Sequence, residues 1–368
     1  MHILVTADTA GGVWTFVREL VTGLTGRGVQ VTLVSFGDFP SPGQKKWMEP
    51  LRNLDYHPTT FKLEWMQDSA ADMEVSAEFL RDIIRRTKPD LIHFNQFYYG
   101  ALDCEVPRVV VAHSDVVSWW MAVHGETPPQ TSWLDWYRHA VMRGLAGATA
   151  VVAPSQWMLD QVERYYLKPN RPAVIYNGRT PALFNPSVTK EQRIMTAGRL
   201  WDQGKNIGLL LAAEMPAPVE IMGARGHGRA QSMELSARKA GPNVHFRPQR
   251  DEQQMAKTLA RTAIYAAPSL YEPFGLAPVE AAFSRCALVV SDIPSFRELW
   301  EDAAVYFRSN DPGELRQALE LLVGDPWLRW RHANLAYKHA LRKFSAARMT
   351  DDYMNLYRAV APAAVAAA

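Results

Sequence analysis

Short runs of apolar residues, each followed by a segment with helical spacing, recur along the chain and limit the folds open to it. In the first half, Ile3-Leu4-Val5 precedes a stretch from Val13 to Gly26 with apolar residues at helical spacing. Further apolar runs lie at 31–36, 91–94, 108–112 and 150–152. Strands that alternate with helices form parallel sheets with helices on both faces. The pattern therefore predicts an α/β fold with a doubly wound parallel sheet.

The same alternation starts again in the second half of the chain. A chain of 368 residues has room for two domains of about 100–200 residues each. We predict two Rossmann-like domains, 1–186 and 187–345, with a boundary at the proline-rich stretch Phe184-Asn185-Pro186. A helix and tail at 346–368 are expected to pack back on the first domain. The second set of apolar runs lies at 193–196, 218–222, 244–246, 263–267 and 287–291, with helical segments at 206–213, 253–260 and 278–284.

Composition excludes several classes of function. The formal net charge is only +2, so nucleic acid is not expected as a partner. The two cysteines, Cys104 and Cys286, are far apart and have no metal-ligand spacing, so neither a disulfide framework nor a metal site is predicted. The N-terminal residues run directly into an apolar strand without the basic region of a signal peptide, and no apolar run approaches about 18 residues. A cytoplasmic location is therefore expected.

The most informative motif follows the expected strand at 263–267. Two carboxylates, Glu272 and Glu280, are separated by seven residues, the first in a loop and the second in the following helix. Gly275 lets a ligand approach the backbone, and the N–H groups at a helix start suit an anion or a sugar hydroxyl. A carboxylate can accept from two vicinal hydroxyls, as on a ribose or a hexose. Open α/β sheets bind ligands beyond the carboxyl ends of their strands, so we expect a site here, in a deep cleft between the domains. For Glu280 alone, the alternative is an acidic residue favoured by the helix dipole.

This motif resembles the E-x7-E motif of retaining glycosyltransferases of the GT-B fold, especially glycosyltransferase family 4. The resemblance implies transfer of a sugar from a nucleoside-diphosphate sugar (UDP, GDP or ADP) to an acceptor hydroxyl, with retention at the anomeric carbon. It also implies that Glu272 holds the donor sugar and that Glu280 holds the ribose. The backbone of three residues completes the implied sugar site: Phe274, Gly275 and Leu276.

A second segment, Gly198-Arg199-Leu200 followed by Lys205-Asn206, resembles the family's Gly-Arg-Leu…Lys segment. In that family the Arg and the Lys bind the donor diphosphate, so the resemblance implies these roles for Arg199 and Lys205. Two cations beyond the end of a strand can neutralise a leaving diphosphate. The spacing is one residue longer than in the commonest form, and Asn206 stands where Gly is usual. The alternative is a pair of solvated surface charges.

Two features of the first domain resemble the same family. Gly11-Gly12 lies between the first strand and the first helix, like the family's N-terminal Gly-Gly loop near the donor phosphate and the acceptor. His113 follows the run at 108–112, like the histidine beside the donor sugar in the family's His-Gly-x-Asp region, although Ser114 replaces the common Gly. The alternatives are a tight turn and a structural histidine. A three-glycine dinucleotide fingerprint is absent, which argues against a nicotinamide enzyme.

Three other segments resemble the family less specifically. Asn177-Gly178 is followed by Arg179-Thr180, where many members have an Asp. The glycine-rich loop at 223–228 departs from the Gly-x-Gly-Pro that relatives often have, and it contains Arg225, a candidate contact for phosphate. The segment Phe246-Arg247-Pro248-Gln249 stands where relatives hold the nucleobase through main-chain groups, and it does not identify the base.

The first domain is also rich in aromatic residues. Aromatic faces stack on sugar rings and acyl chains, so we expect a carbohydrate or lipid-linked acceptor, with core packing as the alternative. The basic residues at 81–88 fit either peripheral contact with the inner face of a membrane or a solvated helix face. The aromatic residues concerned are Phe97, Tyr98, Tyr99, Trp119, Trp120, Trp133, Trp136 and Tyr137.

The resemblance also implies a mechanism. Double displacement needs a carboxylate beneath the anomeric carbon, and the pattern offers no obvious one. Same-face substitution, in which the leaving diphosphate helps to deprotonate the acceptor, needs mainly positioning and charge stabilisation, so no metal or other cofactor is expected. Two other interpretations stay open: a GT-B epimerase or phosphorylase, and a degenerate GT-B pair that binds a nucleotide sugar or acts as a scaffold. The degenerate interpretation is disfavoured because four residues are present together: Glu272, Glu280, Arg199 and Lys205.

Overall fold

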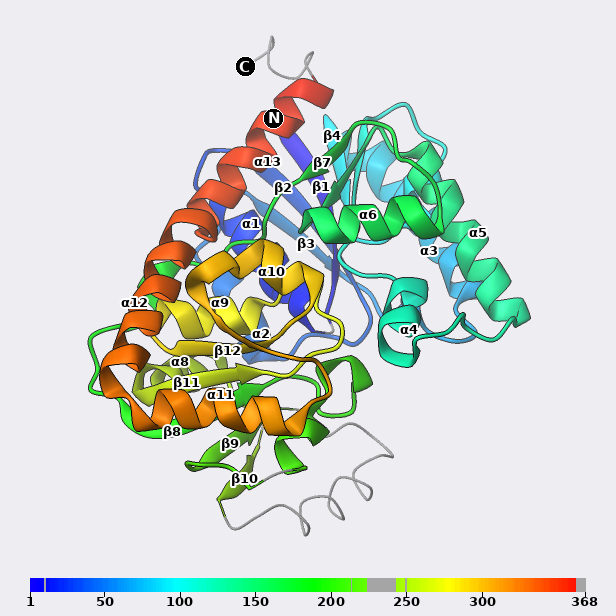
Figure 1. Cartoon of the computed structure of the whole chain (residues 1–368). Helices are drawn as coiled ribbons and strands as arrows, with labels where there is room; N and C mark the ends of the chain where they lie inside the picture. Colours follow the sequence, from blue (N-terminus) through cyan, green and yellow to red (C-terminus); the bar gives the residue numbers. More distant parts are fainter. Residues whose placement is uncertain (10, 213, 224–242, 249, 362–368) are drawn as a thin grey trace. The chain divides into compact units, whose positions relative to one another are not determined.

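The protein divides into two compact units by the contacts among its residues. The fold is that of a computed structural model describing residues 1–9, 11–212, 214–223, 243–248 and 250–361 (Figure 1). Unit 1 comprises Met1–Met121, Glu126–Gly178 and the C-terminal residues from Ala346, and unit 2 comprises Ala122–Gly125 and Arg179–Ser345. The chain therefore passes into unit 2 between Gly178 and Arg179, before the sequence-based boundary at 186.

Unit 1 is built on a seven-stranded sheet in the order β3-β2-β1-β4-β5-β6-β7. Every neighbouring pair is parallel, as the alternation of strands and helices predicts. The strands are β1 (His2–Asp8), β2 (Gln30–Phe36), β3 (Leu54–Pro58), β4 (Leu91–Phe94), β5 (Arg108–Val111), β6 (Ala150–Ala153) and β7 (Pro172–Val174).

The helices of unit 1 follow the strands. The α-helices are α1 (Gly12–Thr25), α2 (Pro42–Lys45), α3 (Ala70–Thr87), α4 (Val116–His124, of which the residues from Ala122 are counted with unit 2), α5 (Ser132–Gly147), α6 (Gln156–Tyr165) and α13 (Ala346–Val360). Two short 3₁₀ helices are η1 (Lys46–Met48) and η2 (Tyr98–Ala101).

The sheet of unit 1 is apolar on both faces. In β1, Ile3 and Val5 belong to one buried cluster and Leu4 to another, because successive side chains of a strand point to opposite faces. Residues of α1 and α13 join the first cluster, and residues of α3 and α5 join the second. Helices thus cover each face of the sheet, as the nearly continuous apolar strands require.

Helix α13 completes the core of unit 1 from the far end of the chain. Tyr353 and Tyr357 are buried in the same cluster as Phe16 of α1. Arg27, just after α1, donates to the Asp351 carboxylate and to the carbonyl of Ala347 at 3.3 Å. Figure 1 shows α13 running beside α1. The predicted return of the C-terminal helix to the first domain is confirmed.

Unit 2 repeats the architecture with a six-stranded parallel sheet in the order β10-β9-β8-β11-β12-β13. Its strands are β8 (Glu191–Ala197), β9 (Val219–Met222), β10 (Val244–Arg247), β11 (Thr262–Ala267), β12 (Ala287–Ser291) and β13 (Val305–Phe307). Its α-helices are α8 (Glu252–Arg261), α9 (Leu276–Phe283), α10 (Pro294–Trp300), α11 (Pro312–Gly324) and α12 (Pro326–Lys343). The 3₁₀ helices are η3 (Pro181–Leu183), η4 (Gln203–Lys205), η5 (Ile207–Leu211) and η6 (Glu301–Ala303).

Side-chain caps fix where several helices begin. Thr131, Ser155 and Asp251 precede α5, α6 and α8, and each side chain accepts a hydrogen bond from a backbone N–H in the first turn. These residue types are the preferred N-caps because a short side-chain oxygen satisfies a donor that the helix leaves unpaired. Among the described residues, no helix has the length and apolar character that a membrane span requires.

Two features depart from the sequence prediction. The strands β3, β7 and β13 were not predicted, because each is only three to five residues long and incompletely buried. The segment expected to form an α-helix at 206–213 contains the 3₁₀ helix η5 instead, within its described residues. Asn206, the residue immediately before η5, is in the left-handed conformation with φ of 48°. Gly208 also lowers the α-helix propensity of the segment.

Each sheet has one point at which the strand order reverses. In unit 1 the chain moves outward from β1 to β3 and then returns to place β4 beside β1. In unit 2 it moves from β8 to β10 and then returns to place β11 beside β8. Ligands of open α/β sheets bind beyond the carboxyl ends of the strands at such points. The residues that follow β1 and β4, and those that follow β8 and β11, are therefore the first places to look for function.

Candidate active site

The two loops at the switch point of unit 2 are joined to each other. They follow β8 and β11, which pair in parallel with Ile194 opposite Ile264. The backbone N–H groups of Leu270 and Tyr271 both donate to the carbonyl of Gly204, at 2.8 and 3.2 Å. The loop that carries Arg199 and Lys205 and the loop that carries Glu272 are thus held side by side.

Lys205 and Glu272 meet across these two loops. The Nζ of Lys205 donates to Oε2 of Glu272, forming an ion pair. The stem of Lys205 packs over Gly198, because a Cβ at that position would be in ordinary van der Waals contact, 3.6 Å from the Cγ and Cδ atoms of Lys205. Two residues that lie far apart in the sequence, and that sequence analysis assigned to the phosphate and the sugar, are therefore direct neighbours.

Arg199 faces a different partner. Its guanidinium donates to Asp202 at 2.7 Å and lies 5.4 Å from the ring centre of Trp201, and 45% of its side chain is exposed. Asp202 also accepts from the N–H of Gly204 and so caps η4. The longer spacing between Arg199 and Lys205 is accommodated by this capped turn.

Asn206 explains one departure from the family pattern. It occupies the left-handed region, with φ of 48° and ψ of 36°, immediately after Lys205. Gly adopts this conformation without strain, and Asn is one of the few other residues that visit it routinely. Asn206 therefore makes a left-handed turn at a position where Gly is usual in the pattern that the sequence resembles.

Gly275 brings the start of α9 close to Glu272. It has φ of 86°, and a Cβ there would lie 3.0 Å from the Cγ of Glu272. Phe274 is buried and packs edge-on against Phe344, with ring centres 5.3 Å apart. Leu276 is the first residue of α9, where helix N–H groups have no partner within the helix. The backbone of these three residues can therefore present donors next to the Glu272 carboxylate.

Glu280 lies in α9 beside a cation that sequence analysis did not assign a role. The Nε of Arg179 donates to Oε1 of Glu280 at 2.8 Å, and the same guanidinium donates to Glu252. The two carboxylates of the E-x7-E motif thus have different cationic partners: Lys205 for Glu272 and Arg179 for Glu280. No local sequence pattern indicates the second pair, because Arg179 precedes Glu280 by 101 residues.

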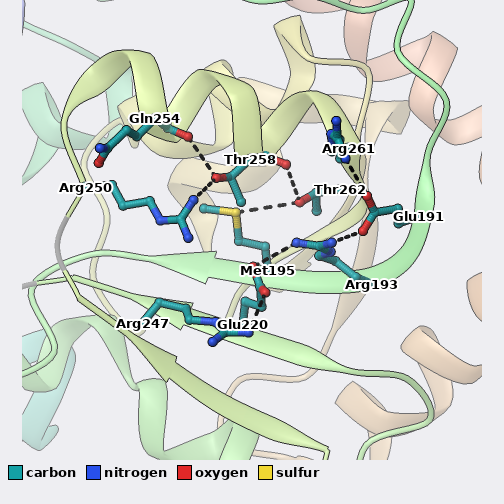
Figure 2. Close-up of polar contacts among 10 residues, drawn as sticks. All are labelled: Glu191, Arg193, Met195, Glu220, Arg247, Arg250, Gln254, Thr258, Arg261 and Thr262. Atoms are coloured by element: carbon teal, nitrogen blue, oxygen red, sulfur yellow. Dashed lines mark hydrogen bonds and ion pairs between the residues drawn. The ribbon is translucent and has the colours of Figure 1, made fainter.

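A further group of charges anchors the strands of this sheet (Figure 2). Glu220 of β9 is buried and accepts from Arg193 of β8 at 3.1 Å and from Arg247 of β10 at 3.2 Å. Because its partners come from the strands on either side, Glu220 ties three strands together. Arg247 belongs to the segment that resembles the family's nucleobase-binding segment, and its side chain forms an ion pair with Glu220 of the neighbouring strand. Gln249 of that segment and Arg225 of the glycine-rich loop lie outside the described residues.

The two glycines of the Gly-Gly loop, Gly11 and Gly12, lie at the start of α1. Gly11 is the residue before the helix, with φ of 75° and ψ of −146°, a conformation that side-chain-bearing residues avoid. Gly12 is the first helical residue. The loop follows β1 at the switch point, where backbone N–H groups at a helix start suit an anion. The structure thus places both glycines at the edge of the sheet that the sequence indicated.

His113 follows β5 in unit 1 and is held by a chain of hydrogen bonds. Nδ2 of Asn95 donates to the carbonyl of Thr6, so Oδ1 of Asn95 is an acceptor. His113 donates from Nε2 to this oxygen at 2.7 Å, and His93 donates from Nε2 to it at 3.2 Å. The proton on Nε2 leaves Nδ1 of His93 to accept from the hydroxyl of Tyr357 at 2.6 Å. Helix α13 is thus connected to the candidate histidine.

His93 and His113 are both neutral at physiological pH. Burial lowers the pKa of His93 to about 4, with the contact to Asn95 acting weakly in the opposite direction. Burial, followed by the nearby His93, lowers the pKa of His113 to about 3. Because Nε2 of the neutral His113 donates to Asn95, Nδ1 is the acceptor that can take a hydrogen bond from a sugar hydroxyl.

The low pKa of His93 predicts a loss of stability in acid. The pKa of His93 is lower in the folded state than in the unfolded chain, so the unfolded chain binds a proton first as the pH falls below about 6.5. The contribution of the neutral His93 to the free energy of unfolding is therefore lost as the pH falls toward 4. We expect the stability difference between the wild type and His93→Gln to shrink by about 2 kcal/mol between pH 7 and pH 5. Urea unfolding of both proteins at the two pH values measures it. The exposed His139 gives the control variant His139→Gln, for which an equal change would contradict the prediction.

The buried carboxylate of Glu64, which sequence analysis did not single out, has the opposite effect on the pH dependence of stability. Glu64 accepts from the N–H groups of Phe97 and Tyr98 at 2.9 and 2.7 Å, just beyond β4. Burial raises the pKa of Glu64 to about 7 despite these two bonds, with a smaller contribution from Asp8. Its folded form takes up a proton first, so its effect on stability becomes more favourable as the pH falls from 7 toward 4.5. Comparison of paired variants is therefore needed to isolate His93.

Most of the aromatic residues of unit 1 belong to its core. Phe97, Tyr99 and Tyr137 are buried in one apolar cluster, and Tyr98, Trp133 and Trp136 pack against it. Trp119 and Trp120 of α4 lie at an intermediate degree of exposure, with ring centres 6.4 Å apart. The core alternative therefore holds for the larger part of the set.

The basic residues of α3 are paired on their own helix. Arg81 contacts Glu78, while Arg85 and Arg86 both contact Asp82, at distances of 2.5, 3.4 and 2.8 Å. These i,i+3 and i,i+4 pairs are typical of a solvated helix face. The structure therefore favours that alternative for this stretch.

Known proteins share the sequence pattern of both halves. A sequence model of Glycosyltransferase Family 4 matches residues 10–182, and one of glycosyl transferases group 1 matches residues 191–325. The α-maltose-1-phosphate synthase of Mycolicibacterium smegmatis is 26% identical over 303 residues, which cover 73% of this chain and 76% of that protein. The phosphatidyl-myo-inositol mannosyltransferase of Mycobacterium tuberculosis is 29% identical over 143 residues, 37% of this chain and 38% of that protein.

Solved structures share the fold along nearly the whole chain. Sucrose-phosphate synthase from Thermosynechococcus elongatus has a TM-score of 0.83 at 18% identity and covers 99% of this chain and 100% of that chain. Anabaena HepE in complex with UDP-glucose has a TM-score of 0.76 at 17% identity and covers 98% and 100%. With both units matched by family models and by GT-B structures, this chain belongs to the GT-B glycosyltransferases of the family 4 and group 1 type, which transfer a sugar from a donor.

Proposed function

We propose that this protein transfers a sugar from a nucleoside-diphosphate sugar to an acceptor hydroxyl with retention at the anomeric carbon and without a metal ion. The observation that carries the proposal is the meeting of Lys205 and Glu272 at the switch point of unit 2. One group suits a diphosphate and the other a sugar hydroxyl, so the leaving group and the sugar of a single donor would lie next to each other.

The comparisons support a nucleotide sugar as the donor. Structural neighbours of this chain were solved with UDP and with UDP-glucose. Relatives in sequence are named as an α-maltose-1-phosphate synthase and as mannosyltransferases. UDP, GDP and ADP are therefore the nucleotides to test.

The proposed reaction is a same-face substitution. The acceptor oxygen forms a bond to the anomeric carbon while the bond from that carbon to the diphosphate oxygen breaks, and its electron pair leaves with the diphosphate. The departing phosphate oxygen takes the proton of the acceptor hydroxyl. Charge develops on the diphosphate, so fixed cations next to it lower the barrier. Arg199 and Lys205 would supply this charge in place of a metal ion.

Binding of the donor would rearrange the ion pair. In the structure the Nζ of Lys205 is bound to Glu272, so a diphosphate competes with the carboxylate for the cation. The Glu272 carboxylate would then accept from hydroxyls of the donor sugar, beside the N–H groups of Phe274, Gly275 and Leu276. Glu280 would accept from the ribose hydroxyls. The exchange replaces one charge pair by two sets of contacts with the same ligand.

Unit 1 would contribute Gly11, Gly12 and His113. The resemblance assigns the glycines to the donor phosphate and the acceptor, and the neutral His113 to the donor sugar. A histidine that stays neutral adds no positive charge beside the anomeric carbon, where the transition state itself becomes positive. The acceptor is proposed to be a carbohydrate or a lipid-linked sugar, and a lipid-linked acceptor would bring the protein to a membrane surface.

Thermal unfolding with UDP, GDP and ADP tests the donor site. A ligand at about 100 times its Kd stabilises a protein by about 2.7 kcal/mol, and the melting temperature should rise by a few degrees. We expect a rise with one nucleotide and its loss in Glu280→Ala. The variant Glu320→Ala removes a glutamate that is ion-paired on the surface of α11 and serves as the control.

The result also separates the alternatives. A nucleotide that binds and whose sugar conjugate is consumed only with an acceptor supports a transferase. Conversion of the nucleotide sugar alone would indicate an epimerase, and dependence on inorganic phosphate a phosphorylase. Absence of any shift would remove the support for a nucleotide-sugar donor, and binding without turnover would favour a degenerate protein.

A further inference from the structure

Arg179 is a buried cation at the entry of the chain into unit 2. Only 1% of its side chain is exposed, and it forms ion pairs with Glu252 and Glu280. A buried guanidinium is costly unless its charge and its N–H groups are satisfied. The two carboxylates supply this compensation, from the first turn of α8 and from α9.

The position of the guanidinium is fixed by more than its ion pairs. Its carbon lies 5.4 Å from the ring centre of Phe184, which stacks on Phe283 at 6.1 Å. The backbone N–H of Arg179 donates to the carbonyl of Phe344 at 2.9 Å, and Arg179 forms a parallel bridge with Ser345. Phe283 and Glu280 both belong to α9. The aromatic pair that packs against the guanidinium and the carboxylate that accepts from it are therefore held by the same helix.

This arrangement constrains how Glu280 can point. Its Oε1 accepts from the Nε of Arg179 at 2.8 Å, so rotation of the carboxylate about its terminal bond would break a charge-assisted hydrogen bond. Two vicinal hydroxyls have a fixed separation and direction, and a carboxylate held in one orientation recognises them better than a rotating one. The planar fork of arginine grips two carboxylates at once, which a lysine ammonium does less specifically.

We propose that Arg179 is a positioning residue for Glu280 and that, braced by Glu252, it sets the preference of the nucleotide site for ribose over 2′-deoxyribose. The inference rests on the proposed function, in which Glu280 accepts from the ribose hydroxyls. Arg179 itself does not touch the nucleotide. Its effect is on the orientation of the carboxylate, so it should change recognition of the 2′-hydroxyl and leave the remainder of the nucleotide contacts in place.

The experiment compares each ribonucleoside diphosphate with its 2′-deoxy counterpart. Dissociation constants for UDP, GDP, ADP and the three 2′-deoxy forms are measured by titration calorimetry for the wild type. The nucleotide that binds is then used with Arg179→Lys, Glu252→Gln and the control Arg297→Lys. Arg297 is an exposed arginine of the same unit, ion-paired with Asp292 at 2.6 Å.

We expect the wild type to bind the ribonucleotide about tenfold or more tightly than its 2′-deoxy form, because the hydroxyl donates to a charged group. Arg179→Lys should reduce this ratio to about threefold or less, with the affinity for the 2′-deoxy form nearly unchanged. Glu252→Gln should give an intermediate ratio, since the guanidinium then keeps one carboxylate. Arg297→Lys should keep the wild-type ratio.

Each outcome decides one of the two claims. If the wild type binds none of the diphosphates, the proposed donor site fails. If the wild type binds but shows no preference for ribose, or if Arg179→Lys keeps the preference, the role of Arg179 is overturned while the donor site stands. Should Arg179→Lys not fold, Glu252→Gln carries the test: an unchanged ratio overturns the inference and a reduced ratio supports it.

Discussion

Replacement of Lys205 by alanine is expected to reduce kcat/KM for the nucleotide-sugar donor by about 10²–10³-fold. The loss of one fixed group that stabilises the charge developing in a transition state typically costs this much. The geometry adds a second effect, because Lys205 is the ion-pair partner of Glu272. Without the ammonium, an uncompensated carboxylate would face the diphosphate, and repulsion between like charges would weaken binding further.

The measurement has a form that does not depend on the acceptor. Affinity for the nucleoside diphosphate should fall strongly in Lys205→Ala, whereas affinity for the nucleoside should stay the same. Adding Glu272→Gln to Lys205→Ala should restore part of the diphosphate affinity, because the double variant removes the repulsive carboxylate charge. Lys257→Ala removes an exposed lysine from α8 and should behave as the wild type. Equal diphosphate affinity in the wild type and in Lys205→Ala would rule out the assigned role.

Substitution of Gly144 by alanine is expected to destabilise the protein by about 3 kcal/mol or more, at the upper end of the range for overpacked sites. A Cβ on Gly144 of α5 would lie 1.7 Å from the carbonyl oxygen of Phe97, next to η2. Two further glycines make the same contact close: a Cβ on Gly100 would meet the Gly144 carbonyl at 2.2 Å, and one on Gly147 the Gly100 carbonyl at 2.5 Å. The obstacle is backbone on both sides, so no side chain can rotate away.

Urea unfolding followed by circular dichroism measures this loss. Alanine favours a helix over glycine by about 1 kcal/mol, so a helical glycine in open space should tolerate the change or gain from it. Gly324 of α11 is such a residue, because nothing lies within 4 Å of a Cβ placed on it. A Gly144→Ala protein as stable as Gly324→Ala would show that α5 and η2 can separate without cost.

The sequence predicts the two sheets because their central strands are buried on both faces. A run such as Val151-Val152 or Val289-Val290 has no polar position to satisfy, and such runs are almost confined to parallel sheets. Three of the four edge strands of these sheets escape detection for the same reason, whereas the fourth, β10, is predicted at 244–246. β3, β7 and β13 carry proline, aspartate or tyrosine within a few residues, since a strand near the edge of a sheet is less completely buried.

The candidate site is predictable where its residues are neighbours in the sequence. Gly275, Glu272 and Glu280 lie within one loop and helix, and their spacing follows from local backbone geometry. Arg179, Glu252 and Glu64 are not predictable in this way. Their partners lie on segments far away in the chain, and only the strand order brings these segments together.

The placement of α13 has a consequence for the order in which the protein can be made. During synthesis the ribosome completes every residue of unit 2 before it reaches Tyr353 and Tyr357, which fill the core of unit 1 beside Phe16. Unit 2 can therefore finish folding while the first-made part of the chain still exposes an apolar sheet face. For that interval the nascent protein is an incomplete domain followed by a complete one, and the uncovered apolar face of unit 1 is a surface through which the chain can aggregate.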